Sequence, residues 1–260
     1  HTALRRQRQM CIRDRNYTNL IKMDERVGKL IKKLKKEDLY DDSYIFFYSD
    51  HGGPFPRHKR AIYETGTKVP FLVKFPGGKN EKVNKKQLLS FVDLAPTVLS
   101  IAGVKSPSEY QGYAFLGKNK SKVEREFLYT SSDRFDNVPD RIRAVRDAKF
   151  KYIRNYNLEN SHALNVLYRK QMLLMRHLTS LHLTGQLDEK SDNWFKSPRS
   201  MEELYDLEND PFELNNLSLD PNYTDIKKKL SLSLDEFLIK IDDLGRIPEE
   251  ELIKLISAED

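Results

Sequence analysis

Two side chains that can bind a metal ion follow directly after the apolar residues 44–48. They are Asp50 and His51. A carboxylate can hold a hard cation such as Ca²⁺ or Mg²⁺, and an imidazole can bind through one ring nitrogen, although it suits softer metals better. The adjacent Gly52 and Gly53 allow the backbone to come close to a ligand. We therefore expect Asp50 and His51 to be metal ligands.

Positive charge and a second imidazole follow within ten residues of this pair. His58 and Lys59 lie between Arg57 and Arg60. Lys59 and His58 could meet an anionic group held by the metal, while the two arginines add positive potential at the rim. Taken singly, an Asp-His-Gly turn or a lysine in a loop is ordinary. The density of ligands and cations after one buried strand favours one wall of an active site.

The elements that must position these residues alternate between helix and strand in the first half of the chain. Apolar residues at helical spacing and short apolar runs bounded by glycine or proline are the signals. Asp93 can cap the last of these helices and Gly103 can end it. The predicted elements are a helix at 17–36, strands at 44–48 and 69–75, and a helix at 93–102.

The pattern of predicted elements changes near residue 125. Short strands with turn residues between them follow, and residues 147–149 read as a hairpin turn. The predicted elements are strands at 127–131, 142–146, 150–156 and 204–207, and helices at 161–183 and 222–241. The pattern predicts an α/β core followed by a smaller α+β subdomain that contains an antiparallel sheet.

Composition excludes several classes of protein. The 260 residues are 38% hydrophobic, which supports a real core, and no run of 18 apolar residues exists to span a membrane. The net charge is +6, but residues 1–15 hold five arginines and one aspartate and supply +4 of it. The remainder is hardly basic enough to indicate a nucleic-acid partner. The single cysteine, Cys11, neither supports nor excludes an oxidising compartment.

Residues 1–15 do not fit the rest of the chain. They lack helical periodicity, and no apolar stretch follows the charges as it would in a signal peptide. They resemble translated adapter sequence at the end of an assembled contig. We therefore expect a non-native extension or a disordered basic tail, with the native N-terminal part of the protein missing.

Several ordered motifs resemble the type I sulfatases of the alkaline phosphatase superfamily. The resemblance covers about residues 17–241, and the Pro-Phe-Pro element at 54–56 is most similar to the heparan N-sulfatase (sulfamidase) branch. It implies an α/β fold with a partial alkaline-phosphatase-like mixed sheet flanked by helices, plus the α+β subdomain. The motifs are Tyr-Ser-Asp-His-Gly at 48–52, Lys59, Tyr-Glu-Thr-Gly-Thr-Lys-Val-Pro at 63–70, and the stretches 91–99, 143–153 and 203–217.

The resemblance also implies roles for individual residues. Asp50 and His51 would be ligands of Ca²⁺, although other members often have Asn in place of His51. Lys59 would contact the substrate sulfate and stabilise charge on its oxygens, and His58 is a weaker candidate for the same pocket. Two further residues would pack the loop: Tyr63 and Glu64.

The chain lacks the family motif that carries the nucleophile, and this difference matters more than the matches. The family's nucleophile is a formylglycine made within a Cys/Ser-x-Pro-x-Arg motif, and no such motif occurs here, since Cys11 lacks the proline. We therefore expect residues 16–124 to be the C-terminal part of a sulfatase catalytic domain and residues 125–260 its subdomain. The chain alone would be inactive. The family is mostly exported or lysosomal, which implies an extracytoplasmic location.

The sequence leaves three functions open. The first is hydrolysis of sulfuric esters or sulfamates on sulfated glycans. The second is hydrolysis of phosphate or phosphonate esters within the same superfamily. The third is a non-catalytic domain that binds sulfated glycans through Arg57, Lys59 and Arg60. The sulfate position on the substrate and the oligomeric state are not readable from the sequence.

Overall fold

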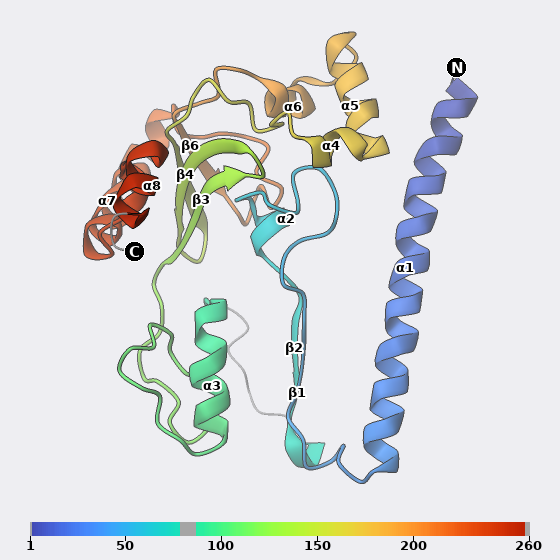
Figure 1. The fold of residues 1–260 in the computed structure, drawn as a ribbon, viewed down its shortest axis with the longest axis vertical. Helices are drawn as coiled ribbons and strands as arrows, with labels where there is room; N and C mark the ends of the chain where they lie inside the picture. Colours follow the sequence, from blue (N-terminus) through green and yellow to red (C-terminus); the bar gives the residue numbers. More distant parts are fainter. Residues whose placement is uncertain (1, 79–86, 258–260) are drawn as a thin grey trace. The chain divides into compact units, whose positions relative to one another are not determined.

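The chain forms two compact units. The computed structural model describes residues 2–78 and 87–257, with side chains from Asp14 onward (Figure 1). One unit comprises His1–Gly52 and Lys68–Val83, and the other Gly53–Thr67 and Asn84–Asp260. The segment Gly53–Thr67, here called the site segment, therefore belongs to the second unit although it follows a strand of the first. The expected functional boundary between residues 124 and 125 stays a prediction.

The first unit contains one long helix and two strands. Helix α1 spans Thr2–Lys36, and strands β1 (Ile45–Tyr48) and β2 (Phe71–Lys74) pair antiparallel, which confirms the predicted helix and strands. The interpretation of 44–48 as a central strand of a covered sheet is wrong for the described residues. Among them β1 pairs with β2 alone, and 45% of Tyr48 is exposed. Apart from β2, no strand of the described residues pairs with β1.

Helix α1 begins earlier than the sequence pattern indicated. It includes residues 2–15, for which no helix was expected. This stretch contains five arginines and two glutamines, which favour helix regardless of periodicity. The structure has a helix where the sequence pattern indicated none, and the expectation of a non-native extension or a disordered tail stays a prediction.

The second unit is built on a four-stranded antiparallel sheet in the order β3-β4-β5-β6. Within the described residues, no helix is long and apolar enough to cross a membrane. The strands are β3 (Leu128–Phe135), β4 (Val138–Arg146), β5 (Phe150–Asn155) and β6 (Glu202–Asp206). The helices are α2 (Glu64–Thr67), α3 (Leu94–Ile101), α4 (Leu167–Gln171), α5 (Leu173–Leu183), α6 (Glu189–Asp192), α7 (Thr224–Lys240) and α8 (Glu249–Ser257).

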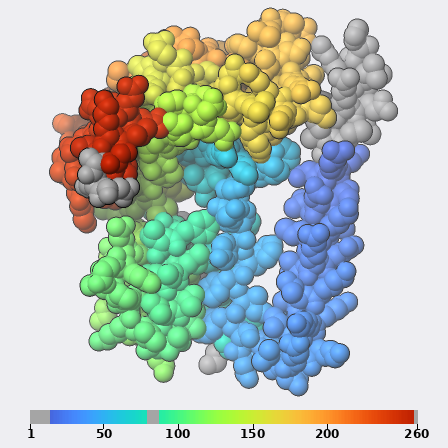
Figure 2. Space-filling model, viewed as in Figure 1, coloured from blue at the N-terminus to red at the C-terminus, as the bar shows by residue number. Residues whose placement is uncertain are grey.

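One face of this sheet packs on helix α7 and is here called the helix face. Alternate residues along the strands point the same way, and at the centre of this face they are apolar. The cluster comprises Val145, Tyr152 and Leu204 from the strands and Leu230 and Leu234 from α7, all at most 1% exposed. Figure 2 shows the C-terminal segment that carries α7 and α8, in red, at the surface of the molecule.

The opposite face, here called the segment face, packs on the site segment. Its apolar cluster joins Ile62 and Tyr63 of the segment to strand residues Ile142, Ala144, Ile153 and Tyr205. The register pairs Ala144 with Ile153 and Val145 with Tyr152, so the two clusters lie on opposite faces. The site segment is therefore held by the C-terminal sheet.

Three local predictions had different outcomes. The hairpin turn is confirmed, because the Asp147 carboxylate accepts the backbone N–H groups of Lys149 and Phe150. The helix expected over 161–183 is instead two helices that meet at Met172, whose ψ of 120° interrupts them. Asp93 does not cap α3, because its buried carboxylate binds elsewhere. Its partners are the N–H groups of Ser90 and Tyr113 and the guanidinium of Arg125.

Candidate active-site residues

Asp50 and His51 lie together in the turn after β1. The Ser49 hydroxyl donates to the carbonyl of His51 at 2.6 Å, which holds this turn. The His51 Nδ1 atom lies 2.6 Å from the carbonyl oxygen of Gly52, and Nε2 lies 3.7 Å from the Asp50 Oδ2 atom. The Asp50 side chain is 84% exposed and that of His51 is 38% exposed.

This pair has the donor chemistry of part of a metal site. Because a carbonyl oxygen only accepts, the Nδ1 atom of His51 donates to Gly52, which leaves Nε2 on the side of Asp50. A backbone carbonyl that orients a metal-binding histidine is a common supporting contact. Within residues 2–78 and 87–257, however, no group of three or more potential ligands exists. Since Ca²⁺ takes six to eight oxygen ligands, the pair could supply only a fraction of a complete shell.

His58 and Lys59 lie in a tight loop of the site segment. The amide of Lys59 donates to the carbonyl of Gly53 at 3.1 Å, and the amide of His58 donates to that of Phe55. The Lys59 ammonium lies 5.8 Å from the centre of the Tyr168 ring on α4. The structure therefore brings these two residues together in the second unit, whereas Asp50 and His51 belong to the first.

The surroundings of His58 favour the neutral form of its imidazole. Its ring packs edge-on against Phe55 at 5.5 Å. Burial, followed by the charge of Arg57, lowers the pKa of His58 below its ordinary value of 6.5. At neutral pH this histidine is suited to hydrogen bonding with an anion rather than to carrying charge. Lys59 is then the stronger candidate for electrostatic contact.

The two arginines beside them have other partners. Arg57 donates to the carbonyl oxygens of Phe212 and Glu213, and its guanidinium stacks on Tyr63. Arg60 pairs with Asp136 in the turn between β3 and β4. Each guanidinium therefore has a partner within the second unit, and the expected contribution of both arginines to positive potential at the rim stays a prediction.

Tyr63 and Glu64 are buried, as expected for residues that pack the loop. Glu64 forms ion pairs with Arg146 and Lys151 of the sheet, the latter at 3.4 Å. The Lys151 ammonium is 2% exposed and also lies 3.2 Å from Glu213. A side chain on Gly66 would collide with the carbonyl oxygens of His58 and Ala61, so the loop requires glycine there.

Glu203 of β6 is a hydrogen-bonding centre on the segment face. Its carboxylate lies 2.9 Å from the His162 ring and accepts from Tyr63, Tyr205 and Asn155 at 3.0, 2.6 and 2.6 Å. Burial alone would raise the pKa of Glu203, but the charge of His162 and these hydrogen bonds lower it to about 2. Glu203 is thus a buried, ionised carboxylate that fixes the Tyr63 hydroxyl.

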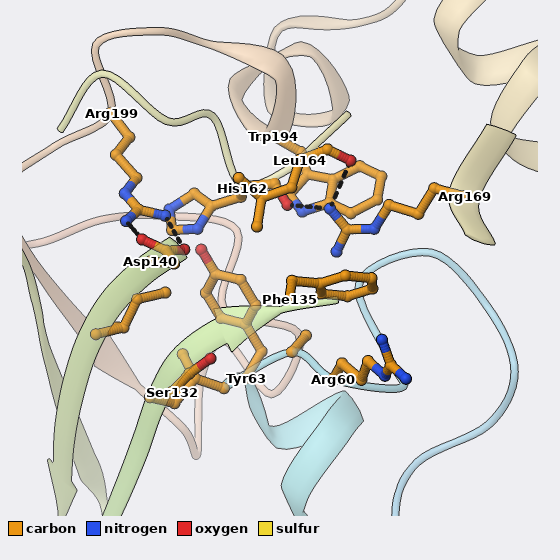
Figure 3. A pocket seen from close by; sticks show the side chains of 13 residues that line it. Arg60, Tyr63, Ser132, Phe135, Asp140, His162, Leu164, Arg169, Trp194 and Arg199 are labelled. Carbon is orange, nitrogen blue, oxygen red and sulfur yellow. Dashed lines mark hydrogen bonds and ion pairs between the residues drawn. The ribbon is translucent and has the colours of Figure 1, made fainter. Parts of the chain in front are cut away.

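A small cavity lies beside this centre (Figure 3). Arg199 pairs with Asp140 within it, both nearly fully buried. Arg169 donates to the carbonyl of His162 at 2.7 Å. Burial, followed by the charge of nearby Arg60, lowers the pKa of Arg169 to about 10. The cavity volume of about 30 Å³ holds one or two water molecules and no sugar ring.

The comparisons with known proteins point to one family. Residues 6–104 match the family model described as Sulfatase. A relative 45% identical over 238 residues, 91% of this chain, is an ulvan-active sulfatase from Formosa agariphila. The chain belongs to the sulfatase family. It spans 40% of the length of that relative.

Two further matches concern the branch of the family and the fold of the chain. The human N-sulphoglucosamine sulphohydrolase is 26% identical over 232 residues, covering 82% of this sulfatase chain and 45% of the relative. The ulvan-active relative is the more similar of the two, so the Pro-Phe-Pro element does not by itself assign the N-sulfatase branch. A putative sulfatase from Bacteroides thetaiotaomicron matches in fold, with a TM-score of 0.63 at 23% identity, over 87% of this chain and 42% of that chain.

Sequence reasoning missed the buried polar residues of the segment face. The residues not foreseen are Asp140, Lys151, Asn155, His162, Arg169, Arg199, Glu203 and Glu213. One signal was available, because β6 reads Glu-Glu-Leu-Tyr-Asp and places charged residues inside a strand pattern. Their partners come from segments about 50 to 150 residues away, which no local pattern predicts.

Proposed function

We propose that this chain is part of a sulfatase that hydrolyses sulfuric esters or sulfamates on a sulfated polysaccharide. The observation that carries the proposal is the 45% identity to an ulvan-active sulfatase over 91% of the chain. That span includes the segment with Asp50, His51, His58 and Lys59. A polysaccharide of the ulvan kind is favoured over an N-sulfated glucosamine, since the latter's relative is 26% identical.

Lys59 would neutralise the sulfate as negative charge builds on its oxygens. Such preorganised electrostatic contact is commonly the largest single term in catalysis. His58, kept neutral by burial and by Arg57, would add a hydrogen bond in the same pocket. The backbone bond from Lys59 to Gly53 supports this role, because it fixes where the lysine side chain starts.

Asp50 and His51 would hold one side of a Ca²⁺ ion. The orientation of His51 by the Gly52 carbonyl supports this assignment. When bound, the ion would supply positive charge next to the sulfate. The remaining ligands, and a formylglycine nucleophile, would come from residues outside this chain, whose sequence lacks a Cys/Ser-x-Pro-x-Arg motif. We therefore expect the 260-residue chain alone to be inactive.

The test compares sulfate release by two polypeptides: this chain alone and the longest natural polypeptide that contains it. Only the longer one should release sulfate from ulvan. Lys59→Ala should reduce the release by about 100-fold or more, by analogy with loss of one oxyanion-stabilising group. Lys68→Ala, an exposed lysine nine residues away, is the matched control and should act like the wild type.

Each alternative function has its own signature in the same assay. Faster turnover of an aryl phosphate than of the aryl sulfate would favour a phosphate or phosphonate ester hydrolase. Binding of ulvan by the longer polypeptide without sulfate release would favour a glycan-binding domain. Equal release by wild type and Lys59→Ala would remove Lys59 from the mechanism.

The metal assignment is tested separately by calcium binding in the longer polypeptide. Titration calorimetry should detect a calcium site that is weakened about tenfold or more in Asp50→Asn, since a charged ligand is lost. Asp38→Asn, a change in the exposed loop after α1, is the control. Unchanged calcium affinity in Asp50→Asn would contradict the assignment.

A further inference from the structure

Arg57 binds the backbone of a distant loop with both ends of its guanidinium. Its Nη1 atom donates to the carbonyl of Phe212 and its Nη2 atom to the carbonyl of Glu213, each at 2.5 Å. The guanidinium carbon lies 3.8 Å from the centre of the Tyr63 ring, which covers one face of the cation. Both Nη atoms of the planar fork thus bind adjacent carbonyl groups.

A second set of contacts fixes the chain on the other side of Lys59. The buried Lys151 ammonium donates to the carbonyl of Ile62 at 2.5 Å. The amide of Glu64 donates to the Glu213 carboxylate at 2.6 Å, and that carboxylate pairs with Lys151. Residues 57–61 therefore form a short arc held at both ends by one loop and one strand.

The backbone within this arc adopts a conformation that side chains normally avoid. Arg57 and Arg60 have φ angles of 63° and 62°, and Glu213 in the partner loop has 55°. Left-handed φ in residues other than glycine is unfavourable and persists only where the surroundings enforce it. The two strained positions of the arc flank His58 and Lys59. The Arg57 contacts are the ones that oppose this strain.

We propose that Arg57 is a positioning residue, which holds the loop so that Lys59 points at the sulfate. This inference rests on the proposed function, because it gives Lys59 the sulfate to bind. The Nη1 and Nη2 atoms of Arg57 each donate to a carbonyl of the 212–213 loop, so the side chain is tied to that loop. The buried pair Lys151–Glu213 supports the same loop from the far end.

The shape of the arginine side chain separates this role from that of a rim cation. Lysine keeps the positive charge but lacks the planar fork with two separate Nη donors, and it cannot stack as a plane on Tyr63. Arg57→Lys therefore preserves any general attraction for an anion and removes both the fork geometry and the stacking. A rim cation would tolerate this change, whereas a positioning residue would not.

The experiment measures amide exchange and activity in the same protein. Arg57→Lys is made in the longest natural polypeptide that contains this chain, with Arg246→Lys as the matched control on an exposed arginine paired with Asp242. In Arg57→Lys the Lys59 amide should exchange about tenfold faster or more, because its loop opens more often. The value of kcat for ulvan desulfation should fall about 100-fold, as expected for a displaced contact group. The control should change neither.

The outcomes separate this inference from the proposed function. Unchanged Lys59 exchange in Arg57→Lys would overturn the positioning role, whatever the activity. A wild type that releases no sulfate would overturn the proposed function, while the exchange data would still decide the role of Arg57. If Arg57→Lys does not fold, Thr65→Val takes its place. It removes the bond from the Thr65 hydroxyl to the Arg57 carbonyl, and it should raise Lys59 exchange to a smaller extent.

Discussion

The two faces of the four-stranded sheet are built from different chemistry. The helix face buries Val145, Tyr152 and Leu204 against α7, and its central contacts are apolar. The segment face also has an apolar cluster, but around it lie Lys151 and Glu203, each at most 3% exposed, together with their partners. The same strands therefore present an apolar centre to helix α7, with ion pairs such as Arg154–Asp235 beside it, and an apolar cluster with buried charges to the segment that carries Lys59.

This difference indicates what each face contributes. Apolar burial stabilises a fold without strict geometry, and a helix can settle on such a surface in many ways. Buried ion pairs gain little net stability, because the loss of hydration opposes the attraction. They do penalise any arrangement that leaves a charge unpaired. We infer that the helix face holds the subdomain together and that the segment face defines where the site segment lies.

The variant with the largest expected effect on stability removes Lys151, the buried cation of the segment face. Lys151→Met leaves Glu64 and Glu213 without their shared partner, and losing one member of a buried ion pair costs about 3–5 kcal/mol. Chemical denaturation should report that loss. Adding Glu213→Gln should restore part of it, because one uncompensated charge is removed.

Lys149→Met is the control for this change. Lys149 lies two residues earlier, is 42% exposed, and its ammonium lies 3.5 Å from Asp206 and 3.7 Å from Glu208. Its loss should cost at most about 1 kcal/mol. Equal losses for the two lysine variants would mean that the charges of the segment face play no special part.

The second test acts on the helix face. Leu230→Ala removes a fully buried side chain of α7 and should cost about 3 kcal/mol, within the usual range for such a cavity. Leu232→Ala changes the same helix where the side chain is 52% exposed, and it should cost much less. The exchange rate of the Lys59 amide should stay as in the wild type. Faster exchange there would contradict the division of roles between the faces.

Patterns along the chain predicted many of the helices, strands and turns of this structure, but they did not predict its buried charged residues. Strand alternation and turn residues located β4 and β5 and the turn at Asp147, because those signals act over a few residues. The broad ligand and cation pattern near Asp50 and Lys59 indicated a site for the same reason. Periodicity also misled, since it joined α4 and α5 into one helix across Met172.

The remainder depends on pairings between distant segments. Arg57 reads as a free cation in the sequence because its partners, the carbonyls of Phe212 and Glu213, lie 155 and 156 residues away. Likewise, Glu203 looks like an exposed acid until His162 and Tyr63 are brought to it by the fold. A charged side chain within a strand indicates that a partner exists, but the identity of the partner requires the structure.

The third test uses acid to weaken the segment face. Glu203 has a pKa of about 2 in the folded chain, below its ordinary value of 4.5, so its ionised form stabilises the fold. For a lowered pKa this contribution is fully present above about pH 4.5 and is lost as the pH falls toward 2. The loss should be roughly 2 to 3 kcal/mol.

The comparison variant for this test is Glu203→Gln, which has no carboxylate to titrate at this position. Its unfolding free energy should be lower than that of the wild type at pH 6, and the two values should converge as the pH is lowered to 2. A constant difference across that range would show that the charge of Glu203 does not stabilise the segment face.

The smallest test concerns a single polar contact on the helix face. The Tyr129 hydroxyl of β3 lies 2.9 Å from that of Ser233 on α7, and the Tyr129 ring stacks on Phe237 at 3.7 Å. Tyr129→Phe keeps the stacking and removes one hydrogen bond, so it should cost about 1 kcal/mol. Tyr110→Phe, at a residue 46% exposed, is the control with almost no expected change. A loss of several kcal/mol from Tyr129→Phe would show that the helix face also depends on a polar contact, and the contrast between the two faces would then be one of degree.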